Sequence, residues 1–198
     1  MNHQHWATRT ARLGLVAVLL VVGCGAGPPE LVVTQDSSLE TPKVVTRLDG
    51  KLALFVLPER FSENEYSVPR AILEDLGAMV VVASWTSDPV LGSRGIVIQP
   101  QLVLDDAYAG DYDAVIFVGG TGVKVTAPET QRIVGEAVAE GKVIAAICAA
   151  QGILRSAGVV QNKGAPAPYV NRNGLIITAS GPIKSPEFGE TIAAALGE

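Results

Sequence analysis

The chain has 198 residues, of which 48% are hydrophobic and 18% are charged, and its formal net charge is −5. This length and composition suit one globular domain that buries its own core, so stability requires neither a disulfide nor a structural metal. The acidic balance and the lack of a Lys/Arg-rich run argue against a nucleic-acid partner.

The first 23 residues are predicted to be a bacterial lipoprotein signal peptide. Arg9 and Arg12 precede the apolar run LGLVAVLLVVG (13–23), which is too short and wrongly flanked for an ordinary membrane-spanning helix. The run leads into VVGC, which resembles a lipobox and predicts acylation of Cys24. An ordinary cleaved secretory peptide is the alternative. Acyl chains on Cys24 would anchor the protein to a membrane of the cell envelope, on its periplasmic or extracellular side.

Cleavage after residue 23 would change the chemistry that the protein has available. It would remove His3 and His5, the only two histidines of the chain, and leave Cys24 and Cys148 as the cysteines. With Cys24 acylated, Cys148 has no disulfide partner within the chain. Residues 24–48 are rich in Pro, Ser, Thr and Gly and are predicted to form a flexible tether, with the folded domain at 49–198.

Apolar runs alternate with helical patterns along the folded domain. Strands are expected at 52–57, 78–84, 113–120, 142–147 and 174–180. Helices are expected at 63–77, 126–141, directly after residue 148, and 185–196. Gly and Pro punctuation between residues 89 and 104 favours short strands or a hairpin. Nearly all-apolar strands alternating with helices predict an α/β fold with a parallel sheet covered on both faces, and with ligands at the carboxyl ends of the strands.

Three of these helices carry start signals. Pro69 is expected near the start of the first helix, where a missing N–H costs least. Thr126 and Glu129 have the spacing of a capping box. Ser185 is expected to cap the last helix, with Pro186 in its first turn.

Cys148 lies where a strand gives way to a helix, at the carboxyl edge of the predicted sheet. Its neighbours two positions away, Ala146 and Ala150, are small enough for the sharp turn of a nucleophile elbow. The helix dipole is expected to favour the thiolate, and the Ala149 N–H to stabilise an oxyanion or an oxidised sulfur. The alternative is a buried structural cysteine, because free cysteine packs as a small hydrophobic residue.

The stretches AAICAA, DYDAVIFVGG, SENEYSVPRAILEDLGAMVVVAS and GLIITASGP with SPEFGETIAAAL occur together in this sequence. They resemble the ThiJ/PfpI superfamily, which includes the parkinsonism-associated deglycase and the PfpI-type peptidases, over most of residues 51–198. The resemblance implies a flavodoxin-like three-layer α/β sandwich with a mainly parallel sheet. It also implies a glutamate whose carboxyl group approaches Cys148. By its spacing to Pro69 this residue is Glu65, with Glu63 as the second choice.

The resemblance gives further residues a role. Gly119 and Gly120 match the family's glycine pair, and the Gly120 N–H is expected to face the sulfur opposite Ala149. Without the family match, Glu65 is an ordinary first-turn carboxylate and the glycines form a plain tight turn. A dinucleotide site at GGTG (119–122) is rejected because the third glycine is absent. Neither a cofactor nor a metal is therefore expected.

Two departures from the family affect the expected chemistry. Peptidase-like members have a histidine directly after the cysteine, whereas this chain has Ala149, so a Cys-His peptidase is not expected. The stretch NKGAPAPYVNRN (162–173) leads almost directly to the last strand, where the family usually has a further strand and helix. This shortening is expected to open one side of the pocket or to leave a strand edge for a second copy to cover, as in a homodimer.

Three functions compete at this point. The first is a Cys/Glu enzyme of the deglycase or glyoxalase kind that acts on small reactive carbonyls. The second is a protein that responds to oxidative stress when an oxidant converts Cys148 to a sulfinate beside Glu65. The third is a non-catalytic lipoprotein that kept the scaffold to bind a ligand or partner.

Overall fold

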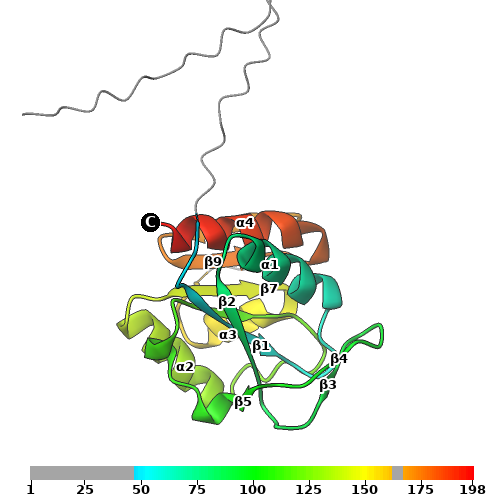
Figure 1. The fold of residues 1–198 in the computed structure, drawn as a ribbon. Coiled ribbons are helices and arrows are strands. Elements are labelled where there is room, and N and C mark those ends of the chain that lie inside the picture. The colour runs from blue at the N-terminus through cyan, green and yellow to red at the C-terminus, as the bar shows by residue number, and fades with distance from the viewer. Residues whose placement is uncertain (1–46, 162–166) are drawn as a thin grey trace, which may run out of the picture. The chain divides into compact units, whose positions relative to one another are not determined.

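The computed structural model describes residues 47–161 and 167–198 (Figure 1). The predicted signal peptide, the acylation site Cys24 and most of the predicted tether lie outside these residues. Leu48, one residue before the predicted domain boundary, is 1% exposed and belongs to the core. None of the helices in the described ranges has the length and apolar character needed to cross a bilayer.

A seven-stranded sheet forms the centre of the fold, in the order β5-β2-β1-β6-β7-β9-β8. Its strands are β1 (Leu52–Leu57), β2 (Met79–Ser84), β5 (Leu102–Val103), β6 (Ala114–Phe117), β7 (Val143–Ile147), β8 (Val170–Asn173) and β9 (Ile176–Ala179). All neighbouring strands are parallel except β8, which pairs antiparallel with β9. The short strands β3 (Val90–Leu91) and β4 (Val97–Ile98) form a separate antiparallel hairpin, as expected from the punctuation in this region.

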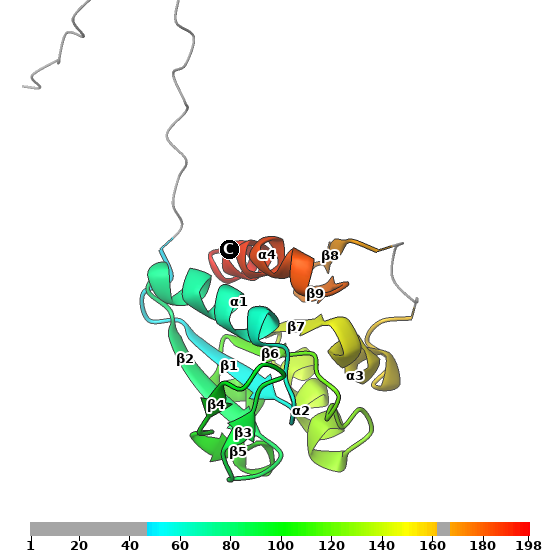
Figure 2. The same ribbon diagram turned by 90° about the vertical axis from the view of Figure 1, so that its right-hand side faces the viewer.

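Helices cover both faces of the sheet (Figures 1 and 2). The helices are α1 (Glu63–Asp75), α2 (Pro128–Ala139), α3 (Gln151–Ser156) and α4 (Ser185–Leu196). One hydrophobic cluster joins α1 and α4 to the sheet, through Tyr66, Leu73, Phe188 and Ile192. The other joins α2 and α3 to the opposite face. This arrangement confirms the predicted three-layer α/β sandwich. The strands are apolar runs in the sequence because helices bury both faces of the sheet.

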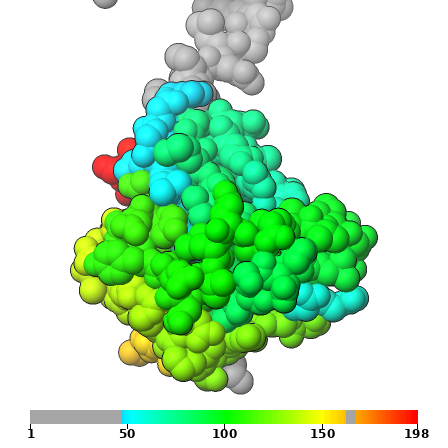
Figure 3. All heavy atoms as spheres, turned by 60° about the horizontal axis from the view of Figure 1, so that its bottom comes forward, coloured from blue at the N-terminus to red at the C-terminus, as the bar shows by residue number. Residues whose placement is uncertain are grey.

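Short 3₁₀ turns complete the connections at Leu104–Asp106, Ala109–Asp111, Cys148–Ala150 and Pro182–Lys184. In Figure 3, the green segment that contains β3, β4 and β5 covers the middle of the face in view. This segment closes the β2 side of the sheet, where β5 is the outermost strand. At the opposite side the outermost strand is β8, which the sequence analysis did not predict.

The predicted helix starts need three corrections. Pro69 lies well inside α1, where it contacts Gly189 of α4. A Cβ added to Gly189 would lie 2.9 Å from the Cα atom of Pro69. The helix nevertheless continues through Pro69 to Asp75, although proline supplies no N–H for its ladder of hydrogen bonds. Thr126 does not cap α2, because the N-cap residue is Ala127 and no side chain bonds there. Ser185 is the first residue of α4 rather than its cap, and its Oγ is buried without a partner in the described residues.

Candidate active site

Cys148 lies at the carboxyl end of β7, in the turn that leads into α3. Its φ is 58°, a left-handed conformation that costs a residue with a side chain about 1–3 kcal/mol. The small side chains of Ala146 and Ala150 are fully buried on either side of the turn. The backbone therefore has the sharp geometry expected of a nucleophile elbow. Cys148 is half-buried and Ala149 is exposed, so solvent reaches the turn.

Glu65 brings a buried carboxyl group to this cysteine from the first turns of α1. Its side chain is 0% exposed, and its Oε2 accepts a hydrogen bond from the Gly119 N–H at 3.1 Å. Its Oε1 has no hydrogen-bond partner among the described residues. The carboxyl group also interacts with the Cys148 thiol, and each group shifts the pKa of the other. The pairing of Glu65 with Cys148 follows the prediction from the family resemblance.

The two ionisable groups of this pair both resist ionisation. Burial raises the pKa of Glu65, although hydrogen bonds from Cys148 and Gly119 oppose this effect. Burial also raises the pKa of the Cys148 thiol, the negative charge of Glu65 raises it further, and the Ala149 N–H lowers it in part. This direction runs against the expectation that the helix end favours the thiolate. Burial and the neighbouring carboxylate outweigh the Ala149 N–H, because both disfavour a negative charge on the sulfur.

Gly119 is the point where the two side chains meet the backbone of the loop after β6. A Cβ at this position would lie 2.3 Å from Oε2 of Glu65 and 2.8 Å from Cβ of Cys148. Gly120 instead packs against the connection after β1, where a Cβ would be 2.8 Å from the Arg60 carbonyl oxygen and from Phe61 Cα. Gly119 is therefore part of the site, and the Gly120 N–H remains a predicted oxyanion donor.

The close approach at Gly119 predicts a large effect for one added methyl group. We expect Gly119→Ala to destabilise the fold by about 1–3 kcal/mol, because the methyl group overpacks the site and displaces Glu65 or Cys148. The matched control is Gly135→Ala in the exposed part of α2, where a Cβ would meet nothing within 4 Å. That change should stabilise the protein by about 0.5–1 kcal/mol. Urea denaturation of both variants measures the difference, and equal stabilities would contradict the packing described for Gly119.

Glu63, the second choice for the site glutamate, has a different role. Its Oε1 accepts hydrogen bonds from the backbone N–H groups of Arg94 and Ile96, at 2.8 and 3.0 Å. A Cβ at Gly92 would approach this same oxygen to 2.6 Å. Glu63 therefore anchors the turn of the β3–β4 hairpin, and its two bonds hold it there.

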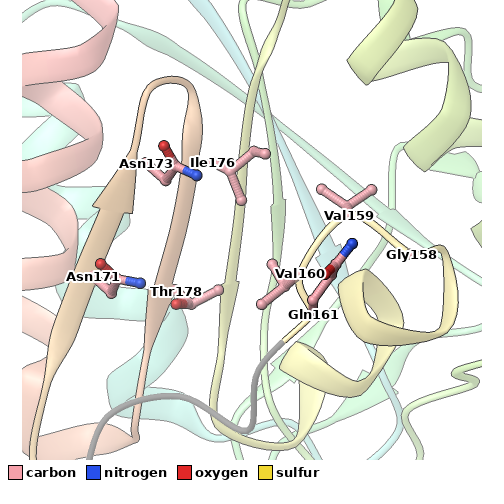
Figure 4. Close-up of a pocket in the computed structure, with 8 residues that line it drawn as sticks. All are labelled: Gly158, Val159, Val160, Gln161, Asn171, Asn173, Ile176 and Thr178. Atoms are coloured by element: carbon pink, nitrogen blue, oxygen red, sulfur yellow. The ribbon is translucent and has the colours of Figure 1, made fainter.

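A separate cavity lies on the α3 side of the sheet (Figure 4). Its volume is about 380 Å³, and its lining comes from the segment that follows α3 and from the β8–β9 hairpin: Gly158, Val159, Val160, Gln161, Asn171, Asn173, Ile176 and Thr178. Neither Cys148 nor Glu65 lines it. The cavity is thus distinct from the candidate active site.

The sequence analysis missed two polar residues beside the elbow, Gln151 and Tyr169. Gln151 is only 8% exposed, and its side chain bonds to the Ala179 carbonyl and to the Tyr169 hydroxyl. Its position on the first turn after the elbow, where its neighbours Ile153 and Leu154 face the core, was the available signal that its amide would be buried. Within the described ranges no group of three or more His, Cys, Asp or Glu residues could hold a metal ion.

Comparison with known proteins gives the family. The DJ-1/PfpI family model matches residues 51–168. A deglycase of Pyrococcus horikoshii is 32% identical over 125 residues, which cover 59% of this chain and 72% of the relative. The glutathione-independent glyoxalase DJR-1.2 of Caenorhabditis elegans is 32% identical over 116 residues, covering 57% of this chain and 62% of the relative.

A solved structure agrees with this match. The crystal structure of Drosophila melanogaster DJ-1beta superimposes with a TM-score of 0.68 at 27% identity, and it covers 74% of this chain and 90% of that chain. The similarity thus extends from the sequence to the arrangement of the strands and helices around the elbow. This chain belongs to the DJ-1/PfpI family.

Proposed function

We propose that this protein is a Cys/Glu enzyme of the glyoxalase or deglycase kind that acts on small reactive carbonyls. The observation that carries the proposal is the strained turn at Cys148 with the buried carboxyl group of Glu65 beside its sulfur. Strain in a residue with a side chain, at a sheet edge where ligands bind, is typical of a functional site. The similarity to a deglycase and to a glyoxalase supports the same class of substrate.

Because the pKa of the Cys148 thiol is raised, its attack on a carbonyl group needs a base, and the Glu65 carboxylate is that base. As the Cys148 sulfur attacks the aldehyde carbon of a 2-oxoaldehyde, a C–S bond forms and the π electron pair of the C=O group moves to oxygen. The thiol proton passes to the Glu65 carboxylate at the same time, so a free thiolate need not accumulate. The N–H groups of Ala149 and Gly120 are the proposed donors to the new oxyanion.

The adduct then rearranges and is hydrolysed without an external oxidant. Glu65 first gives the thiol proton to the oxyanion and becomes a carboxylate again. It then removes the proton on the former aldehyde carbon while the ketone oxygen gains a proton, which gives an enediol. Return of a proton to the second carbon, with loss of the hydroxyl proton from the first, oxidises the first carbon and reduces the second. The product is a 2-hydroxy thioester on Cys148. Water adds to its carbonyl carbon, the C–S bond breaks, and the 2-hydroxy acid leaves as the thiol takes up a proton.

One observation favours this function over a scaffold kept only for binding. A scaffold kept only for binding gives no reason to retain a strained cysteine beside a buried carboxyl group whose Oε1 has no partner in the part of the chain described. The direct test is the conversion of methylglyoxal to lactate by the full-length chain. Absence of lactate above the uncatalysed rate would remove the proposal.

We further propose that the enzyme is anchored through Cys24 to a membrane of the bacterial cell envelope. The support is the order of basic residues, apolar run and small residues before Cys24. We expect the mature protein to begin at an acylated Cys24, and Cys24→Ala to move it from the membrane fraction to the soluble fraction. Intact mass and fractionation of both forms measure this. An unmodified N-terminus after residue 23 would instead indicate an ordinary secretory peptide.

A further inference from the structure

The turn at Cys148 needs contacts that hold it in its strained conformation. The 3₁₀ turn Cys148–Ala150 leads into α3, whose first residue is Gln151. Neither the turn nor the helix start has a side-chain cap. A left-handed residue persists only where its surroundings fix it, so the groups that grip this helix start also fix the position of the sulfur.

Gln151 holds the start of α3 in place. Its Nε2 donates to the Ala179 carbonyl at the end of β9, at 2.8 Å, and its Oε1 accepts from the Tyr169 hydroxyl at 2.6 Å. Tyr169 is held in turn by Ser180, since its N–H donates to the Ser180 Oγ and its carbonyl accepts from the Ser180 N–H, both at 3.0 Å. The carboxamide therefore ties the elbow to both C-terminal strands, and we refer to Gln151 and Tyr169 as the brace.

The brace is also connected to the backbone beside Glu65. Gly181 follows Ala179 by two residues, and a Cβ on Gly181 would lie 3.9 Å from Oε1 of Glu65. The end of β9, to which Gln151 is hydrogen-bonded, thus continues directly into the backbone that faces the Glu65 carboxyl group. The buried Gln151 amide therefore connects the helix start beside Cys148 with the backbone beside Glu65.

Tyr169 comes from the connection for which the sequence analysis expects a shortening relative to the family. It directly precedes β8, and Val170 of β8 pairs with Ala179 of β9. The start of β8 therefore lies at the same edge of the sheet as the carboxyl end of β9, next to the elbow. Tyr169 thus places its hydroxyl group within hydrogen-bond distance of Gln151, beside the elbow.

We propose that Tyr169 and Gln151 are positioning residues that hold the Cys148 elbow in register with Glu65. The expected effect on kcat rests on the carbonyl reaction proposed above. The expected effect on the ionisation of the Cys148 thiol does not. Loss of the brace lets the elbow relax and admits water to the sulfur. The thiol then becomes easier to ionise, because its burial is reduced, while its alignment with Glu65 is lost.

The test compares Tyr169→Phe with the control Tyr108→Phe in the full-length chain. Both changes remove one hydroxyl group, and the Tyr108 hydroxyl bonds to Glu140 on the exposed surface. We expect Tyr169→Phe to lower kcat for methylglyoxal about tenfold with KM within about twofold, because a small displacement of a reacting group reduces the rate. Alkylation of Cys148 at pH 7 should become at least about threefold faster by the same loosening. Tyr108→Phe should change neither rate.

Gln151→Met serves as a second variant, since it keeps the length of the side chain and removes both hydrogen bonds. It should reproduce the slower turnover and the faster alkylation. Wild-type alkylation rates in Tyr169→Phe and Gln151→Met would overturn the proposal. If the wild-type chain turns over no carbonyl, the alkylation rates still decide whether the brace exists, so its failure is separate from that of the proposed function.

Discussion

Cys148→Ser is expected to lower the rate of methylglyoxal conversion by about 10³-fold or more, because the hydroxyl group that replaces the thiol is a far weaker nucleophile beside this base. The turn is held by the packing of Ala146 and Ala150 and by the hydrogen bonds of Gln151, which this change leaves in place, and serine is close in size to cysteine. The melting temperature should therefore change little. Lactate formation under saturating substrate, with circular dichroism to follow the fold, measures both effects.

The matched control for this change is again Tyr108→Phe, which removes a polar group far along the chain from the elbow. It should retain the wild-type rate. Equal rates in wild type and Cys148→Ser would show that the sulfur takes no part in the reaction.

Glu65→Gln is expected to lower the same rate by about 10²–10⁴-fold, since the amide cannot accept the thiol proton or move protons between the two substrate carbons. The change keeps the size of the side chain, and its amide oxygen can still accept from the Gly119 N–H. A loss of rate with KM nearly unchanged would assign the effect to the chemical step. A variant with wild-type kcat would remove Glu65 from the mechanism.

The same variant has a predicted effect on stability that depends on pH. Burial raises the pKa of Glu65 in the folded state, so the folded protein resists ionisation that the unfolded chain undergoes freely. The wild type is therefore penalised as pH rises above the ordinary range of a glutamate, near 4.3, up to its folded pKa. Glu65→Gln lacks this penalty and should be the more stable protein near pH 8, with the difference vanishing below about pH 4. Thermal unfolding at the two pH values measures the change.

The fold could be predicted from the sequence because its main signals are local. The buried strands of the sheet are apolar runs, and the pattern of α1 and α4 places residues such as Leu73 and Ile192 on one face. Strand β8 was missed because it is a polar edge strand, whose Asn171 and Asn173 are exposed. Helix starts were also wrong where tertiary packing decides, as at Pro69, which contacts α4 from inside α1.

The site could be predicted only in part. Cys148 stands out locally, since a thiol with small neighbours lies between a strand and a helix. The pairing with Glu65 needed the family resemblance, because 83 residues separate them along the chain and no local pattern joins them. The sequence shows the helix end, which favours the thiolate, whereas burial and the carboxylate, which raise the pKa of the Cys148 thiol, act through space. Gln151 and Tyr169 were missed for the same reason.

The central claim is that one sulfur and one buried carboxyl group at the edge of this sheet behave as a single proton-sharing pair. The rate of Cys148 alkylation as a function of pH, followed by peptide mapping in wild type and in Glu65→Gln, tests this claim most directly. The midpoint should lie above the ordinary thiol range in the wild type and at lower pH in the variant, because the amide carries no charge to oppose the thiolate. Identical midpoints in the two proteins would contradict the account.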